Sequence, residues 1–366
     1  MRENVPESVV EQRSIVSELR SSPWKLGVVA LLLVFPPIIT SVFADAAFWI
    51  TFAVEVFVFG IGVLSYDLLF GYTGLLTFGH ALFFGGGAYG IAIMANVFGL
   101  NYFEAFPIVV VLLLVLSLLV GVAALQLSGV YFAIITLAFA QLGYELVLQF
   151  NSVTGGVNGI YDISIPDVIG FDITEPVVTY YVTLLAAIAV YLVLRRVTNS
   201  PFGRVIQGIR ENEERIQMLG VDPFRYKLAS FAMAGVVGGF AGMLYPLFLT
   251  FVSPPIINWT TTGDLLMMTL IGGFGTLWGP LLGTGFYIGL KTILSGVIEQ
   301  WRLLMGIIFV LFVLFLPSGL AGLLRGEQRT TSGLRARIQD VLPGGPDRTS
   351  TPDVRTSPTS EEEDRE

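Results

Sequence analysis

The sequence has no cysteine, a single histidine and few charged residues. The absence of cysteine excludes disulfides, thiolate nucleophiles and cysteine-based metal sites. The chain has one histidine, His80, so a histidine-rich metal site is excluded. A Ser-His-Asp triad would have no base other than this residue. Charged residues make up 13% of the chain, whereas a soluble domain has about 25%. Together these shortages argue against a soluble enzyme.

Basic residues are missing from a long internal stretch. Lysine and arginine do not occur between residues 26 and 194. Hydrophobic residues make up 54% of the sequence, and the mean hydropathy is +0.75. A chain this apolar needs lipid as its solvent, because water would meet too many apolar side chains. We therefore predict an all-α polytopic protein of the cell membrane, in contact with lipid and binding no nucleic acid.

The apolar runs predict about ten transmembrane helices. A helix needs roughly 20 apolar residues to span a bilayer. Ten stretches meet or approach this length: 26–43, 48–70, 79–98, 104–126, 129–150, 177–194, 228–252, 260–274, 276–299 and 302–324. The eighth is short and flanked by glycine, which leaves a re-entrant half-helix open. The glycine-rich stretches predict broken or short helices.

The distribution of basic residues predicts the orientation. The loop 195–227 holds seven lysine and arginine residues, whereas the loop 151–176 holds none. Basic loops remain in the cytoplasm, so the N-terminus, the loop 195–227 and the C-terminus are predicted to be cytoplasmic, and 151–176 external. An even number of crossings must then follow residue 227, which favours 260–274 as a true, short crossing.

The chain is predicted to have three regions. A cytoplasmic tail, 1–25, precedes a transmembrane domain, 26–325. The remaining segment, 326–366, is rich in proline, serine, threonine and charge. Such a composition cannot bury a core, so this segment is predicted to be a disordered cytoplasmic tail.

Glycine is concentrated in two membrane segments, 71–90 and 272–285. Glycine in a span permits either close helix packing or a broken helix that lines a cavity. The second interpretation predicts that both segments flank a translocation path, with Gly74, Gly79, His80, Gly273 and Gly275 as candidate residues. A third glycine-rich stretch, 234–242, has the spacing of a helix-contact surface.

Four acids lie in or at the ends of predicted spans: Glu55, Asp67, Glu145 and Asp264. A charge at the bilayer centre costs about 2.5–3.5 kcal/mol on insertion scales, so each acid needs a partner, water or a proton. Asp264 is expected in the first turn of its helix, where the helix dipole favours an acid. Glu55 or Glu145 is a candidate to meet the ammonium group of an amino-acid substrate. The alternative is an acid that faces a wet vestibule.

The segment 199–231 is more than a connector. Ser200 and Pro201 form a helix-start pattern, an amphipathic run follows, and Gly220 ends it. Acids alternate with bases along this run, which favours docking on a partner protein over an anionic lipid surface. A phosphate-binding loop needs glycine directly before its lysine, and no lysine here has one. If ATP drives this protein, another subunit hydrolyses it.

Five ordered motifs are similar to those of branched-chain amino-acid ABC importer permeases of the longer, M type. Residues 71–89 read GYTGLLTFGHALFFGGGAY, close to the family's GY-x-G-LLS-x-GHAAFFG-x-GAY. The others are LSGVYFAIITLAFAQ (127–141), TGGVNGI (154–160), SPFGR…IRENE…LGVDPFRYKL from Ser200, and GGFGTLWGPLLG (272–283).

The resemblance implies a permease subunit without an ATPase site or cofactor of its own. In such importers two permeases and two ATP-binding subunits form the core, and an external solute-binding protein delivers the substrate. The second permease is expected to be a shorter paralogue. The loop helix becomes the coupling helix, where Glu214 and Gly220 keep the family spacing, with Arg210, Glu211 and Leu219 as further coupling residues. Asp67 stands where the family more often has asparagine.

Other functions remain open from the sequence. Related permeases carry urea or short amides, and the sequence does not separate these from leucine. An ion-driven carrier would use Glu55, Glu145 and His80 as ion or proton sites, with His80 otherwise a hydrogen-bonding residue at a helix end. A membrane enzyme would have only carboxylates to work with, and no close carboxylate pair lies within a predicted span.

Overall fold

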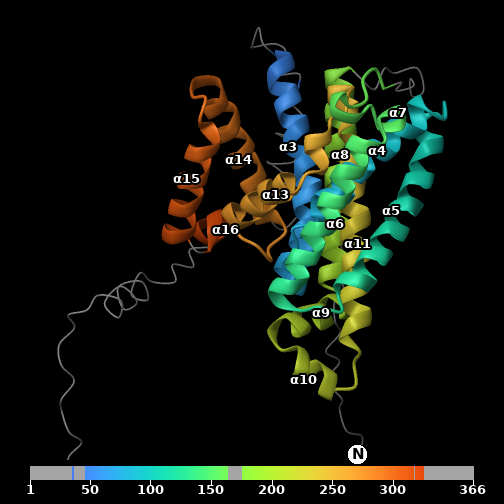
Figure 1. Ribbon diagram of the computed structural model, residues 1–366. Coiled ribbons are helices and arrows are strands. Elements are labelled where there is room, and N and C mark those ends of the chain that lie inside the picture. Colours follow the sequence, from blue (N-terminus) through green and yellow to red (C-terminus); the bar gives the residue numbers. More distant parts are fainter. Residues whose placement is uncertain (1–34, 37–45, 164–174, 317, 325–366) are drawn as a thin grey trace, which may run out of the picture. The chain divides into compact units, whose positions relative to one another are not determined.

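The computed structural model describes residues 35–36, 46–163, 175–316 and 318–324. Within these ranges the chain is helical, with one isolated bridge between Ile160 and Val252. The longer helices are α3 (Ala46–Asp67), α4 (His80–Asn96), α5 (Tyr102–Ala124), α6 (Gly129–Gln149), α8 (Pro176–Thr198), α9 (Pro201–Glu211), α11 (Pro223–Leu244), α13 (Trp259–Gly272), α14 (Trp278–Val297) and α15 (Trp301–Phe315) (Figure 1). Short elements are η1 (Leu68–Thr73), α7 (Asn151–Thr154), η2 (Gly156–Asn158), α10 (Glu213–Met218), α12 (Pro246–Leu249), η3 (Pro254–Ile257) and α16 (Gly319–Leu324). The segment 326–366, predicted to be disordered, lies outside the described residues.

Six helical segments of the described chain are long and apolar enough to cross a membrane. They are Ala46–Thr73, Tyr102–Ala124, Gly129–Gln149, Pro176–Thr198, Pro223–Leu249 and Trp301–Leu323. The prediction of a helical membrane protein is confirmed. Of the other four predicted spans, 26–43 lies almost wholly outside the described residues, and the rest coincide with α4, α13 and α14. The count of ten spans therefore stays a prediction.

The short helix α13 occupies the eighth predicted span. Its 14 residues rise about 21 Å at 1.5 Å per residue, which is less than the roughly 30 Å of a hydrocarbon core. The helix begins at Trp259, so Asp264 lies beyond the first turn in which it was expected. The partner of Asp264 is a tyrosine of the next helix, described below, and the dipole argument for this acid was wrong.

Helix α11 packs against α3, α4 and α5, and small residues allow this close approach. A methyl group on Gly242 would overlap the carbonyl oxygen of Phe84, and one on Gly87 would overlap that of Gly239. The Tyr102 hydroxyl of α5 also donates to the carbonyl oxygen of Met243, at 2.7 Å. The prediction of a helix-contact surface at 234–242 is confirmed.

Both glycine-rich segments interrupt their helices, as predicted. Helix α3 continues beyond Asp67 as the wider turn η1 and ends at Gly74, whose φ of 78° lies in the left-handed region. Helix α13 ends at Gly273, with φ of 99°, and α14 begins only at Trp278. Each break frees backbone N–H and carbonyl groups that need partners inside the protein.

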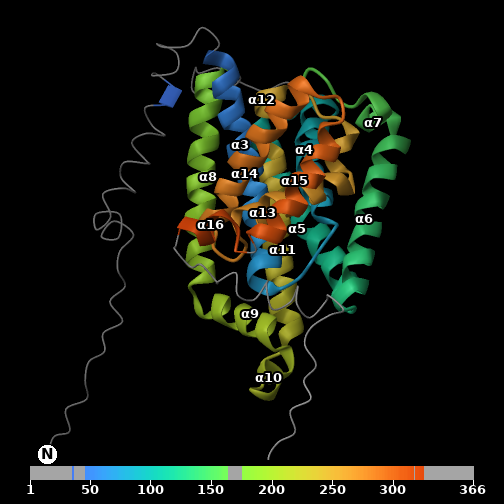
Figure 2. The same cartoon turned by 90° about the vertical axis from the view of Figure 1, so that its left-hand side faces the viewer.

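The loop between α8 and α11 contains two helices where one amphipathic run was predicted. Both views place α9 and α10 beyond one end of the bundle (Figures 1 and 2). The start at Ser200 is confirmed, because its hydroxyl accepts from the Gly203 N–H at 3.3 Å. The run breaks at Asn212, whose side chain caps α10 by accepting from the Arg215 N–H at 2.9 Å. Gly220 follows α10 with φ of 80°, as expected of a helix-ending glycine.

Candidate functional site

Arg210 connects the loop helices to both helix breaks. It lies in the last turn of α9, and its Nη1 donates to the carbonyl oxygen of Gly71 in η1. The same guanidinium lies 5.3 Å from the ring centroid of Phe274, in the segment between α13 and α14. A planar guanidinium suits this double role, because it donates in its plane and stacks with its face. We call Asp67, Gly71, Arg210, Phe274 and Gly275 the coupling junction.

Asp67 holds the two helix breaks together. One carboxylate oxygen accepts from the Gly275 N–H at 2.7 Å, and the other from the Leu277 N–H at 3.3 Å. The carboxylate is fully buried. Leu277 itself has φ of 57°, a strained conformation that persists only where the surroundings determine it. Asp67 therefore uses its two acceptor oxygens to fix the backbone that separates α13 from α14.

Gly71 of the coupling junction and Gly74, which ends η1, leave no room for side chains. A methyl group on Gly71 would overlap the Asp67 carboxylate, and its carbon would lie 2.5 Å from the Gly275 nitrogen. A methyl group on Gly74 would lie 2.8 Å from Cγ of Arg210. The structure thus places Arg210, predicted for coupling, beside Gly74 and Gly275, predicted for the path. Gly273, also predicted for the path, lies against Ser318 and Ala321 instead.

The other predicted coupling residues form an exposed surface on α10 and its flanks. Glu211, Glu214, Leu219 and Gly220 are all exposed, and Leu219 is 74% exposed. Nearby, Lys227 of α11 forms an ion pair with Glu213 at 2.5 Å, which holds α10 against α11. Met218, the neighbour of Leu219, is 80% exposed, so two adjacent apolar side chains lie in solvent among acids and bases.

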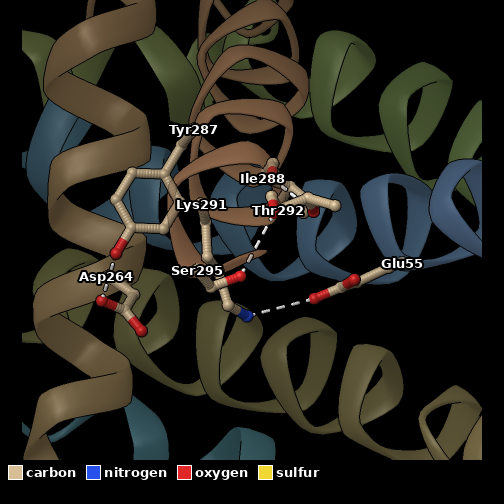
Figure 3. A network of polar contacts seen from close by, with 7 residues as sticks. All are labelled: Glu55, Asp264, Tyr287, Ile288, Lys291, Thr292 and Ser295. Atoms are coloured by element: carbon tan, nitrogen blue, oxygen red, sulfur yellow. Dashed lines mark hydrogen bonds and ion pairs between the residues drawn. The ribbon is translucent and has the colours of Figure 1, made fainter. Parts of the chain in front are cut away.

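A second polar cluster lies among α3, α13 and α14 (Figure 3). Lys291 Nζ is 3.3 Å from an oxygen of Glu55, and the two side chains are 36% and 26% exposed. One helical turn before Lys291, the Tyr287 hydroxyl donates to Asp264 at 2.6 Å. Glu55, a candidate to meet a substrate ammonium or to face a wet vestibule, pairs with a lysine of the same chain. The sequence argument overlooked Lys291, although a lysine inside the predicted span 276–299 is itself a signal.

His80 begins α4 and is completely buried. The Ser65 hydroxyl donates its proton to the Gly62 carbonyl oxygen at 2.6 Å, so its oxygen accepts from His80 Nε2 at 2.7 Å. The other ring nitrogen, Nδ1, has no hydrogen-bond partner among the described residues. These contacts support a hydrogen-bonding residue at a helix start, because a proton relay needs a partner at both nitrogens.

Two further predicted residues lie apart from both clusters. Gly79 precedes α4, where a methyl carbon would lie 2.5 Å from the carbonyl oxygen of Thr136. Glu145 of α6 is exposed and accepts a hydrogen bond from Gln141 one turn earlier, at 2.9 Å. Among the described residues no group of three or more histidine, aspartate or glutamate side chains is placed to hold a metal ion.

Both clusters lie within a stretch that matches a known family. The family model for the branched-chain amino acid transport system permease component matches residues 48–314, which run from α3 to α15. The chain belongs to this family. It is therefore a multi-pass membrane permease, in agreement with its six long apolar helices.

Curated members of the permease family cover most of the chain. The high-affinity branched-chain amino acid transport system permease protein LivM of Escherichia coli is 27% identical over 335 residues, which are 84% of this chain and 77% of the relative. The protein of the same name from Salmonella typhimurium is 27% identical over 293 residues, 74% of this chain and 69% of the relative. No solved structure matches the chain.

Proposed function

We propose that this chain is the permease subunit of an ATP-driven importer for branched-chain amino acids. Family membership supports the transport role, and the names of the relatives support the substrate class. In this proposal the chain forms part of the translocation path and separate subunits hydrolyse ATP. Two ATP-binding subunits, a shorter paralogous permease and an external solute-binding protein complete the assembly.

The coupling junction is the observation that carries the mechanism. Arg210 joins α9 to η1 and to the segment 273–277, so a displacement of α9 acts on two membrane helices at once. The ATP-binding subunit docks on the exposed surface that includes Glu214, Leu219 and Gly220. When ATP closes the ATPase pair, the displaced α9 moves η1 and the start of α14 and shifts the balance between inward-open and outward-open states.

The proposal includes the topology that the sequence predicted. Ten crossings, with both termini and α9–α10 in the cytoplasm and 151–176 outside, place the docking surface on the side where ATP is present. Helix α13 then crosses only together with its flanking segments, because it is too short alone.

The proposal is tested by copurification followed by transport. A tag on the C-terminal tail, gentle solubilisation of native membranes and mass spectrometry identify the subunits that accompany the chain. We expect ATP-binding subunits and a second permease in stoichiometric amounts, and ATP-dependent leucine uptake when the complex and its binding protein are reconstituted in vesicles. Recovery of the chain alone, under conditions that preserve a control ABC transporter, would contradict the proposal and favour an ion-driven carrier.

A second substrate class, urea or a short amide, is tested in the same vesicles. We expect unlabelled leucine, isoleucine and valine to compete with labelled leucine, and urea or acetamide not to compete. Competition by urea alone would support an ATP-driven permease whose substrate is urea and not a branched-chain amino acid.

A further inference from the structure

We propose that Glu55 and Lys291 form a transient binding site for the charged groups of the amino acid during its passage. Glu55 receives the α-ammonium group and Lys291 the α-carboxylate. This inference rests on the proposed function and goes further, since it assigns the recognition of a zwitterion to two residues of this chain. It also separates amino acids from urea, which carries neither charge.

The pair has the charge pattern of the ligand and is not sealed. Its two charges are 3.3 Å apart, and the side chains remain 36% and 26% exposed. A fully buried ion pair could not be opened without leaving both charges unpaired. A zwitterion avoids this penalty, because it supplies the opposite charge to each partner as it separates them.

Neighbouring contacts direct Lys291 toward Glu55. Tyr287 and Lys291 are four residues apart on α14, so they share a helix face. The Tyr287 hydroxyl donates a hydrogen bond to the Asp264 carboxylate at 2.6 Å (Figure 3). One oxygen of Asp264 thereby accepts a hydrogen bond from Tyr287, whereas the ammonium of Lys291 pairs with Glu55. Glu55 and Lys291 are the acid and the base that we assign to the two ends of the zwitterion.

Aromatic side chains adjoin the acid. Phe59 lies one turn after Glu55 on α3, and its ring centroid is 6.4 Å from that of Tyr245. The ring centroid of Tyr245 is in turn 5.1 Å from that of Phe248. All three rings are partly exposed. An ion pair beside a partly exposed aromatic surface fits an amino acid with an apolar side chain better than a small neutral amide.

The natural absence of cysteine makes a direct test possible. Thr51 lies one turn before Glu55 and is partly exposed, and Thr51→Cys changes its size little. The assembled complex carrying this variant is placed in nanodiscs and treated with a small methanethiosulfonate reagent, and the modification of this chain is followed by its intact mass. Ser152→Cys, an exposed position in α7, is the matched control.

The reaction is measured with leucine, leucinamide, which lacks the carboxylate, and 4-methylpentanoate, which lacks the ammonium. We expect leucine at about ten times its dissociation constant to slow modification at Thr51→Cys by about tenfold, and the two analogues and urea to have no effect. The rate at Ser152→Cys should stay unchanged throughout. Adding Glu55→Gln or Lys291→Met should abolish the protection by leucine.

Two outcomes overturn the inference while leaving the proposed function intact. One is an unchanged rate with leucine in a complex that transports leucine. The other is equal protection by leucine and by both analogues, which would reveal a conformational effect or an apolar site. The ligand series needs no change in the ion pair, so a folding defect in Glu55→Gln cannot obscure it. Failure of the unmodified complex to take up leucine would instead overturn the proposed function.

Discussion

At the scale of the residue, Asp67 depends on partners that lie far along the chain. Its carboxylate accepts the N–H groups of Gly275 and Leu277. Asparagine has one acceptor oxygen in place of two, so Asp67→Asn keeps one of these bonds and Asp67→Ala keeps neither. A buried N–H without a partner costs about 1–3 kcal/mol. We expect the melting temperature of the purified permease to fall in the order wild type, Asp67→Asn, Asp67→Ala.

A matched control for Asp67 is Asp222, which caps α11 by accepting from the Phe224 N–H at 3.1 Å. Asparagine caps helices about as well as aspartate, and the exposed ion pair of Asp222 with Arg225 contributes little to stability. Asp222→Asn should therefore have the melting temperature of the wild type. Equal melting temperatures for all the Asp67 variants would show that the two N–H groups find other partners.

Arg210 is expected to affect the use of ATP more than stability. Coupling between two sites is typically about 1–3 kcal/mol, or roughly 5–150-fold, so Arg210→Ala, which removes the contacts with Gly71 and Phe274, should lower leucine uptake per ATP hydrolysed by about tenfold. Arg210→Lys should be intermediate, because its ammonium keeps the charge and loses the planar contact with Phe274. Arg204→Ala, an exposed position on the same helix, is the control. Transport and ATPase activity that fall in parallel would argue against a coupling role.

At the scale of the element, the contact between α4 and α11 depends on glycines, which have no side chain. Gly242→Ala would force a methyl group into the Phe84 carbonyl oxygen, and we expect a loss of stability of several kcal/mol or no folded protein. Gly263 of α13 has nothing within 4 Å of an added methyl, and Gly263→Ala should stabilise by about 0.5–1 kcal/mol, as alanine does in a helix. Thermal unfolding of both variants measures the difference. A similar melting temperature for the two would contradict the packing.

Local signals predicted the helix ends well. Ser200 caps α9 through a contact three residues away, and Gly220 ends α10 in the left-handed region, both as predicted. The break at Asn212 was missed because asparagine between two glutamates looks like an ordinary position on the polar face of a helix. The pairing of Glu55 with Lys291 joins positions 236 residues apart. A single sequence contains no signal for such a pairing beyond the presence of two unusual charges.

At the scale of the whole molecule, the predicted orientation can be tested with two exposed side chains. Val157, in the predicted external loop, is 80% exposed, and Leu219, near the predicted docking surface, is 74% exposed. An impermeant maleimide should modify Val157→Cys in intact cells and Leu219→Cys only after permeabilisation. The opposite pattern would invert the topology and place α10 out of reach of an ATPase.

The long-range contacts of α3 also have a consequence for synthesis of the protein. Lys291 follows Glu55 by 236 residues, and Gly275 follows Asp67 by 208. At about 5–20 residues per second, both acids stay without these partners for roughly 10 to 50 seconds after α3 leaves the ribosome. Each acid disfavours entry into the bilayer centre by about 2.5–3.5 kcal/mol. We therefore expect helix α3 to reach its final depth and rotation only after the segment from 273 to 291 has been made.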